Sequence, residues 1–183
     1  MKPEIVGKQV AWIGKYLQSV LFRFRNSSGH IISWEAFQRV GCRGIAAIVP
    51  FTADGLVILT KQYRPPVNKY VIEFPAGLND RNETLEEVSK RELLEETGYK
   101  ADSVQFICEG PLSSGASSEI MTVFLARDVV DTGKQMPDDA EEIEIIRLPV
   151  EGFHDALYSL QDKDTFIDLK TPGLFELAKN VNS

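Results

Sequence analysis

The stretch from residue 77 to residue 99 constrains the fold of this chain most strongly, because it carries its own start and stop signals for a helix. Thr84, followed three residues later by Glu87, forms a capping-box pattern. Gly98 stands where the left-handed residue that ends a helix belongs. The pattern predicts a helix over residues 85–97, preceded by a loop.

Three carboxylates lie close together on this predicted helix. Glu92, Glu95 and Glu96 are spaced i, i+3 and i+4, so their side chains project from one side, within reach of a common point. Carboxylates this close repel one another unless cations neutralise them. The spacing therefore raises the question of what faces them.

A solvated acidic face is the common interpretation of a glutamate-rich helix. Helical geometry disfavours it here, because at about 100° per residue Leu85 and Val88 fall in the same angular sector as the three glutamates. A face that begins buried should not end in bulk water, and carboxylates at the margin of a core require a hard cation. Ligation by oxygen alone selects Mg²⁺ or Mn²⁺ over Zn²⁺.

Composition limits the class of protein and its partners. A chain of 183 residues with 43% hydrophobic content can bury the core of one compact domain. Its net charge of -7 disfavours nucleic-acid backbones and anionic membranes as partners. His30 and His154 are the only histidines, which excludes a histidine-rich metal site and disfavours a Ser-His triad.

The chain is expected to be cytoplasmic. Its first residues contain no apolar run of signal-peptide length, and nowhere do about 18 apolar residues follow one another. Cys42 and Cys108 form no Cys-x-x-Cys motif, which disfavours a disulfide framework or a thiolate zinc site. Both are expected to be reduced, buried thiols.

Hydrophobic patterning predicts an α/β or α+β layered domain. Residues 1–40 are predicted to form a small N-terminal β unit, because two apolar runs flank the turn-rich Asn26-Ser27-Ser28-Gly29. Asp54-Gly55 is a hairpin signal between the next two strands. The expected strands are 44–51, 56–63, 70–74, 104–108, 120–125 and 143–148, and two helices are expected at about 152–160 and from Thr171, with Pro172 at its first position.

Residues 77–99 match the Nudix box, G-x5-E-x7-R-E-U-x-E-E-x-G-U with U apolar, at every fixed position. The chain thus resembles the Nudix hydrolases. This resemblance implies a mixed β-sheet between helices, and a loop-helix-loop motif that binds divalent cations within a catalytic domain of residues 41–183.

The same resemblance assigns roles to the box residues. Glu92 and Glu96 are implied to be the principal catalytic metal ligands, with Glu95 auxiliary and the Ala76 carbonyl completing the shell. The remaining positions are implied to be structural, with an ion pair bracing the loop: Gly77, Glu83, Arg91 and Gly98.

The flanks of the box resemble the ADP-ribose and ADP-sugar pyrophosphatase branch of these enzymes. The similar segments are Lys61-Gln-Tyr-Arg64-Pro-Pro and Glu73-Phe-Pro-Ala-Gly77, and the resemblance extends over about residues 14–150. Arg64 ends a predicted strand and can fork onto a diphosphate, which gives an acidic protein a positive partner for its substrate. A surface ion pair is the alternative for this arginine.

Aromatic residues of the N-terminal unit are implicated in binding a nucleotide base. On residue type alone, Tyr16 and Trp34 favour packing in a core. The resemblance implies instead that Trp34 sandwiches an adenine, that Tyr16 is a second aromatic contributed by the other subunit of a dimer, and that Arg39 lies near the ligand. A homodimer is expected, because so small a unit cannot bury its own faces, and the resemblance implies that the subunits exchange their N-terminal units.

Cleavage of a diphosphate needs an activated water, and a metal ion assisted by a carboxylate is the economical route when histidine is lacking. The resemblance places that carboxylate in a loop before a late strand. Glu141 is the favoured general base, with Glu142 and Asp139 as substitutes. Glu119 is a further acidic candidate beside the substrate.

The predicted activity is Mg²⁺-dependent hydrolysis of ADP-ribose, or of a related nucleoside diphosphate sugar, to a nucleoside monophosphate and a sugar phosphate. The nearest alternative is a broad-specificity or GDP-mannose-type hydrolase. A non-catalytic sensor of nucleotide sugars is the alternative from another class, and the complete box disfavours it.

Overall fold

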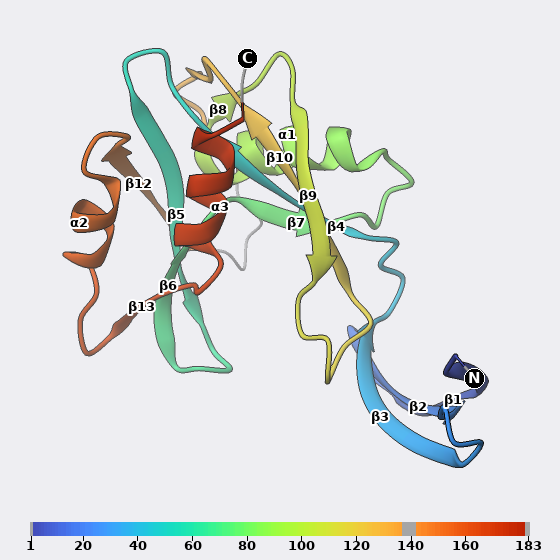
Figure 1. The fold of residues 1–183 in the computed structure, drawn as a ribbon. Helices are drawn as coiled ribbons and strands as arrows, with labels where there is room; N and C mark the ends of the chain where they lie inside the picture. The colour runs from blue at the N-terminus through green and yellow to red at the C-terminus, as the bar shows by residue number, and fades with distance from the viewer. Residues whose placement is uncertain (1, 137–141, 182–183) are drawn as a thin grey trace.

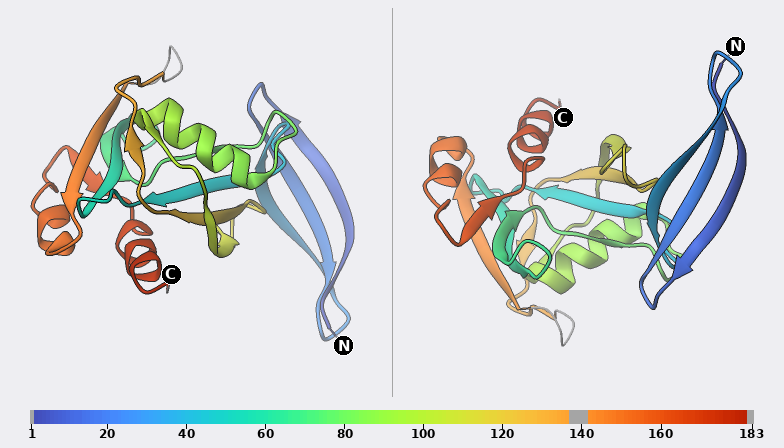
Figure 2. Two further views of the ribbon diagram at one scale, coloured as in Figure 1. Left: turned by 90° about the horizontal axis from the view of Figure 1, so that it is seen from above. Right: turned by 90° about the horizontal axis from the view of Figure 1, so that it is seen from below.

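The N-terminal residues form a three-stranded antiparallel sheet that stands beside the rest of the chain in the computed structural model, which describes residues 2–136 and 142–181 (Figures 1 and 2). Its strands are β1 (Glu4–Ile13), β2 (Leu17–Arg25) and β3 (Ile31–Arg39), in that order. The meander predicted around residues 26–29 is confirmed. It is longer than the apolar runs suggested, because β1 pairs with β2 from end to end.

Two four-stranded sheets make up most of the remaining chain. The first has the order β7-β4-β10-β9, with β4 parallel to β10 and antiparallel to β7. The second has the order β12-β5-β6-β13. The bounds are β4 (Ile45–Pro50), β5 (Leu56–Arg64), β6 (Lys69–Glu73), β7 (Ala76–Leu78), β9 (Gln105–Pro111), β10 (Ile120–Ala126), β12 (Ile143–Pro149) and β13 (Thr165–Ile167), and the short pair β8 (Tyr99–Lys100) and β11 (Val130–Asp131) lies apart.

Helices cover the sheets from two sides. Helix α1 (Leu85–Thr97) and helix α3 (Thr171–Lys179) lie on opposite sides of β4, and α2 (Phe153–Tyr158) lies beside β12 (Figure 2). The main core is buried between these layers and includes Leu59, Phe153 and Phe175. The predicted α/β layered domain, with a mixed sheet between helices, is confirmed.

The turn predicted at Asp54-Gly55 is present, but the prediction that the two flanking strands form a hairpin is wrong. Gly55 has the positive φ of 82° that the turn requires, and the N–H of Thr52 donates to the carbonyl of Leu56. The two flanking strands share only the bridge between Phe51 and Val57 and then enter different sheets. Each strand finds more partners elsewhere: β4, buried along its whole length, lies between β7 and β10, and β5, buried over most of its centre, lies between β12 and β6.

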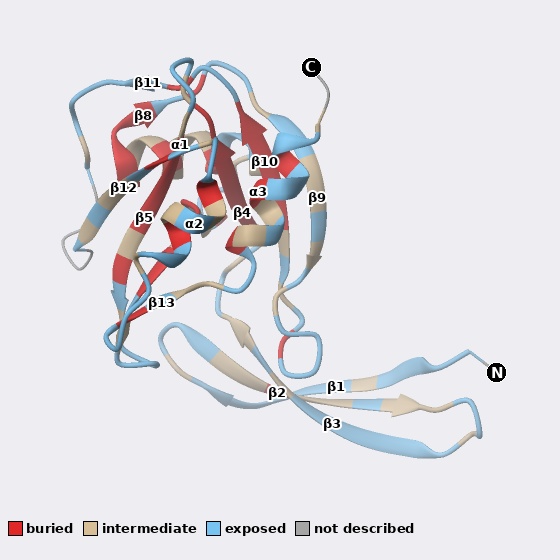
Figure 3. Cartoon of the chain, turned by 60° about the vertical axis from the view of Figure 1, so that its left-hand side comes forward, coloured by how far each residue is buried: buried red, intermediate tan, exposed pale blue. Residues whose placement is uncertain are grey.

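Burial differs sharply between the two parts of the chain. Figure 3 shows buried residues concentrated in the four-stranded sheets, whereas Val20 is the single buried residue among the described strands of the N-terminal sheet. Cys42 and Cys108 are free thiols as expected, but both are only partly buried. In the described ranges, no helix combines the length and the apolar character that crossing a membrane requires.

Candidate active site

Helix α1 has both predicted caps. The hydroxyl of Thr84 accepts a hydrogen bond from the Glu87 N–H at 3.2 Å, and the Glu87 carboxylate accepts one from the Thr84 N–H at 2.8 Å. The backbone and side-chain hydrogen bonds from Thr84 hold the pKa of Glu87 below its usual value. Gly98 has a φ of 72° and closes the helix by donating to the Leu94 carbonyl.

The glutamates of α1 lie at the margin of the core. Val88 and Leu93 are completely buried, so they fix which side of the helix faces the sheets. Glu96 is only 6% exposed, and the side chains of Glu92 and Glu95 are 14% and 30% exposed. These exposures exclude a fully solvated acidic face.

Arg91 links the carboxylates of the box to one another. Its Nη1 lies 2.8 Å from an oxygen of Glu92 and 2.8 Å from an oxygen of Glu95, and its Nε lies 3.0 Å from Glu83. Its Nη2 donates to the Leu78 carbonyl at 3.3 Å. Burial lowers the pKa of Arg91, but the hydrogen bonds that it donates to Glu95 and Glu83 and the charge of Glu92 outweigh this effect and raise the pKa overall. Arg91 is therefore a permanent cation that braces the loop against the helix.

Gly77 leaves room for a glutamate. A Cβ at this position would lie 1.9 Å from both Cδ and Oε1 of Glu92. Next to it, the backbone N–H of Ala76 donates to the carboxylate of Glu96 at 3.3 Å. Strand β7 thus holds two of the three glutamates by direct contact with its backbone.

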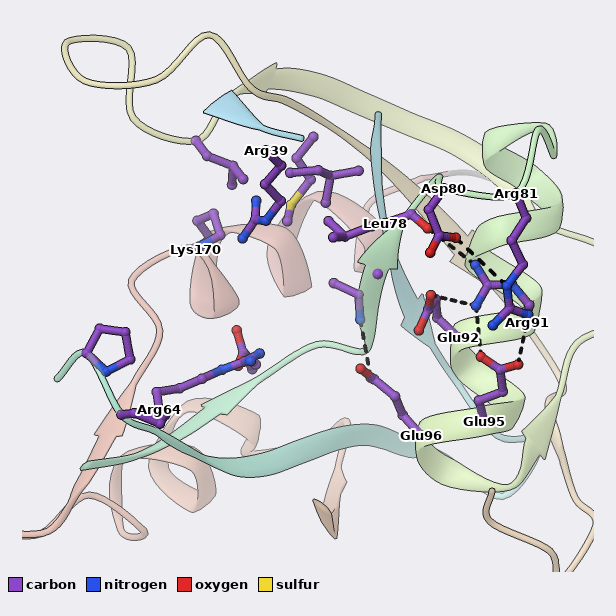
Figure 4. A pocket seen from close by; sticks show the side chains of 18 residues that line it. Arg39, Arg64, Leu78, Asp80, Arg81, Arg91, Glu92, Glu95, Glu96 and Lys170 are labelled. Carbon is purple, nitrogen blue, oxygen red and sulfur yellow. Dashed lines mark hydrogen bonds and ion pairs between the residues drawn. The ribbon is translucent and has the colours of Figure 1, made fainter. Parts of the chain in front are cut away.

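These side chains line a cavity of about 590 Å³ (Figure 4). Glu92, Glu95 and Glu96 project from α1 on one side, next to Arg81 and Arg91. The other cations, Arg39, Arg64 and Lys170, lie across the cavity. The cavity is lined by five cations and five anions, so their formal charges cancel: Arg39, Arg64, Arg81, Arg91, Lys170, Glu73, Asp80, Glu92, Glu95 and Glu96.

The donor set fits a hard divalent cation. Within residues 2–136 and 142–181, no three His, Cys, Asp or Glu side chains are arranged, as they stand, to share one metal ion, because Glu92 and Glu95 both turn toward Arg91. The donors at the cavity wall are nevertheless carboxylate and backbone oxygens, and the space above Gly77 accommodates a carboxylate without a clash. Ala76 lines the same wall.

The cations opposite α1 are held by carboxylates. Arg64 donates from Nε and Nη2 to the carboxylate of Glu73, at 2.8 and 2.5 Å. The ion pair that was the alternative for Arg64 is therefore present, and the same guanidinium also lines the cavity. Arg39 lies 2.8 Å from Glu119. The sequence analysis missed Lys170 and Arg81. No local pattern marks Lys170, because the pairing of β13 with β6 brings it to the cavity. Arg81 was missed because it occupies a variable position of the box.

The N-terminal aromatics lie outside this cavity. Trp34 is 50% exposed, and its indole N–H donates to the Gly115 carbonyl at 2.8 Å. Tyr16 is 69% exposed. These exposures argue against core packing of either ring. A second cavity, of about 440 Å³, lies between β1, β3 and the start of β10 and is lined by both Arg39 and Glu119.

The candidates for the general base differ in what surrounds them. Glu141 and Asp139 lie outside the described residues. Glu142 is exposed. Glu119 accepts hydrogen bonds from the backbone and guanidinium of Arg39, so its carboxylate is already engaged. Glu119 is not among the described residues that line the cavity of the three glutamates.

Several known proteins are similar to this chain. An ADP-ribose pyrophosphatase of Bacillus subtilis is 35% identical over 129 residues, which are 70% of this chain and 68% of that protein. An ADP-sugar pyrophosphatase of Mus musculus is 33% identical over 151 residues, 74% of this chain and 68% of that protein. A GDP-mannose pyrophosphatase of Yersinia enterocolitica is 36% identical over 119 residues, 60% of this chain and 59% of that protein.

The fold is also known. The crystal structure of an ADP compounds hydrolase superposes with a TM-score of 0.79 at 23% identity, covering 98% of this chain and 93% of that one. An uncharacterised Nudix hydrolase of Schizosaccharomyces pombe is 33% identical over 81% of this chain and 78% of its own length. The model of the NUDIX domain matches residues 42–169. The chain therefore belongs to the Nudix family of hydrolases.

Proposed function

We propose that this protein is a Mg²⁺-dependent pyrophosphohydrolase that cleaves the diphosphate of ADP-ribose, or of a related nucleoside diphosphate sugar, into a nucleoside monophosphate and a sugar phosphate. The observation that carries the proposal is the cavity in which three box glutamates face Arg64 and Arg39. The similarity to pyrophosphatases of ADP-ribose and ADP-sugars supports the choice of substrate.

Nudix hydrolases generally depend on divalent cations. In this chain Glu92, Glu95, Glu96 and the Ala76 carbonyl would hold Mg²⁺, with Mn²⁺ as a substitute. A bound cation would stabilise negative charge on the diphosphate and activate water. It would also give a net positive charge to a cavity whose formal charges otherwise cancel, and so favour a dianionic substrate.

The protein's own residues position the substrate and accept a proton. Arg64 is held in place by Glu73 and presents a planar guanidinium toward the cavity, which suits a phosphate oxygen. We assign Glu141 as the proton acceptor. The residues just before that segment lie next to the box helix, which supports the assignment. The N–H of Met136 donates to the carbonyl of Glu95, and the side chain of Gln135 donates to the carbonyl of Glu96.

The proposal includes a homodimer in the cytoplasm, with Tyr16 and Trp34 binding the base. Its support is the N-terminal sheet, whose large apolar residues are widely exposed: Ile5, Trp12 and Ile13 are each at least 60% exposed. An apolar surface of this kind favours association with a second copy. Residues 1–40 would then be a dimerisation and base-binding unit.

The proposed activity is tested by measuring phosphate-containing products from ADP-ribose, GDP-mannose, UDP-glucose and a nucleoside triphosphate, each with and without Mg²⁺. Glu96→Gln is the blank, and Glu86→Gln, on the same helix but outside the cavity, is its matched control. Selective Mg²⁺-dependent turnover of ADP-ribose is expected. Comparable rates on all diphosphate sugars would favour the broad-specificity alternative, and tight binding without turnover would show a sensor.

Base stacking is tested with Trp34→Ala. Because the indole is half exposed and lies outside the main core, the variant should fold and should raise KM for ADP-ribose about tenfold with little change in kcat, as expected for loss of one aromatic contact. Phe106→Ala, an exposed aromatic on β9, controls for nonspecific effects. An unaltered KM in Trp34→Ala would remove the indole from the binding site.

A further inference from the structure

Arg81 differs from the other cations of the cavity in how loosely it is held. It lies in the loop between β7 and α1, and its side chain is 53% exposed. Its Nη1 lies 3.6 Å from Oε1 of Glu95, and its Nε lies 3.8 Å from Asp80. Both distances are too long for a hydrogen bond.

The remaining cations that line the cavity form shorter ion pairs than Arg81 does. Among the described lining residues, Arg39, Arg64, Arg91 and Lys170 each lie within 3.0 Å of a carboxylate oxygen. Moving any of them onto a substrate would break a short, charge-assisted hydrogen bond. Arg81 can move at a much smaller cost, because an exposed ion pair of this length contributes little.

The partner of Arg81 is one of the proposed metal ligands. Glu95 presents Oε2 to Arg91 at 2.8 Å and Oε1 to Arg81. A divalent cation bound through Oε1 would therefore take the place of the Arg81 guanidinium and repel it. Arg81 lines the cavity (Figure 4), so the displaced side chain would stay close to the negative charge of a diphosphate bound there.

We propose that Arg81 is a diphosphate-binding residue that the divalent cation releases for this role. Before the cation binds, Arg81 neutralises Glu95. After it binds, the guanidinium contacts a phosphate oxygen of the substrate. This inference rests on the proposed function, because it uses Glu95 as a metal ligand and a diphosphate as the substrate.

Two measurements on Arg81→Gln test the inference, and they should shift in opposite directions. Mn²⁺ binding in the absence of substrate, measured by calorimetry, should become about two- to fivefold tighter, because a competitor for Glu95 is gone. KM for ADP-ribose at saturating Mg²⁺ should rise about tenfold, because a contact to phosphate is lost. If Arg81 merely braced the loop, its substitution would weaken both the binding of Mn²⁺ and the binding of ADP-ribose.

Controls separate this inference from the proposed function. Lys163→Gln removes the same charge from a residue that is 91% exposed and outside the cavity, and it should change neither value. Arg81→Lys should recover part of the wild-type KM. If wild-type protein binds Mn²⁺ and hydrolyses ADP-ribose while Arg81→Gln matches it in both measurements, the role of Arg81 is refuted and the proposed function stands. If wild-type protein neither binds Mn²⁺ nor turns over ADP-ribose, the proposed function itself fails.

Discussion

At the scale of single residues, Gly77 has no side chain and so leaves space for the carboxylate of Glu92. The carboxylate of Glu92 occupies the space that a Cβ on Gly77 would fill. That carboxylate is the far end of a flexible side chain, so a substitution at Gly77 would move Glu92 more readily than it would unfold the protein. We therefore expect a side chain at Gly77 to disturb the site more than it lowers the stability of the fold.

Gly77→Ala should lower kcat/KM by at least about 100-fold while costing about 1 kcal/mol of stability or less, since a misplaced metal ligand affects catalysis far more than folding. The measurements are steady-state kinetics and chemical denaturation. Gly110→Ala is the matched control, because no heavy atom lies within 4 Å of a Cβ built there. Wild-type kinetics in Gly77→Ala would mean that the position of Glu92 is unimportant.

At the scale of elements, α1 depends on a cap that is sensitive to pH. Because the folded state lowers the pKa of Glu87, the carboxylate stabilises the protein above its unfolded pKa, and this contribution is lost as the pH falls through the folded pKa. The usual value is 4.5, so the loss occurs on the acid side of neutrality.

Glu87→Gln should accordingly melt below the wild type at pH 7, and the two melting temperatures should converge as the pH falls through the lowered pKa of Glu87. Thermal melts at several pH values measure this. Glu86→Gln removes the same charge from the same turn but keeps both capping-box bonds, and its melting temperature should depend less on pH. A difference between Glu87→Gln and wild type that is constant with pH would contradict the assigned role of the carboxylate.

At the scale of the whole molecule, the proposed dimer predicts that inactive variants complement each other. If Tyr16 serves the site of the partner subunit, a mixed dimer of Tyr16→Ala and Glu96→Gln contains one site with both residues intact. Random exchange of subunits would restore about a quarter of the sites. Activity at low ADP-ribose concentration should therefore rise on mixing.

The control for this experiment mixes Glu92→Gln with Glu96→Gln. Both substitutions lie on α1, so neither arrangement of the subunits restores a site, and no activity should return. If the Tyr16→Ala and Glu96→Gln mixture also stays inactive, although an affinity tag on one variant co-purifies the other and so shows subunit exchange, Tyr16 acts within its own subunit or not at all.

The sequence by itself determined the features that depend on neighbours along the chain. The helix over residues 85–97, its two caps and the common side of Glu92, Glu95 and Glu96 follow from local hydrogen bonds and helical periodicity. The family could also be predicted, because the box lies within 23 consecutive residues, from Gly77 to Tyr99. The layered α/β architecture followed from the alternation of strands and helices.

Only the tertiary structure decided which distant segments meet. The turn at Asp54-Gly55 was predictable, but the separation of its flanking strands into two sheets was not, because it depends on competition between strand partners. The same holds for Lys170, which pairing between β6 and β13 brings to the cavity, and for the ion pair that joins Arg39 to Glu119 across 80 residues. Contacts of this kind leave no local signal, since their energies depend on packing and burial in the complete fold.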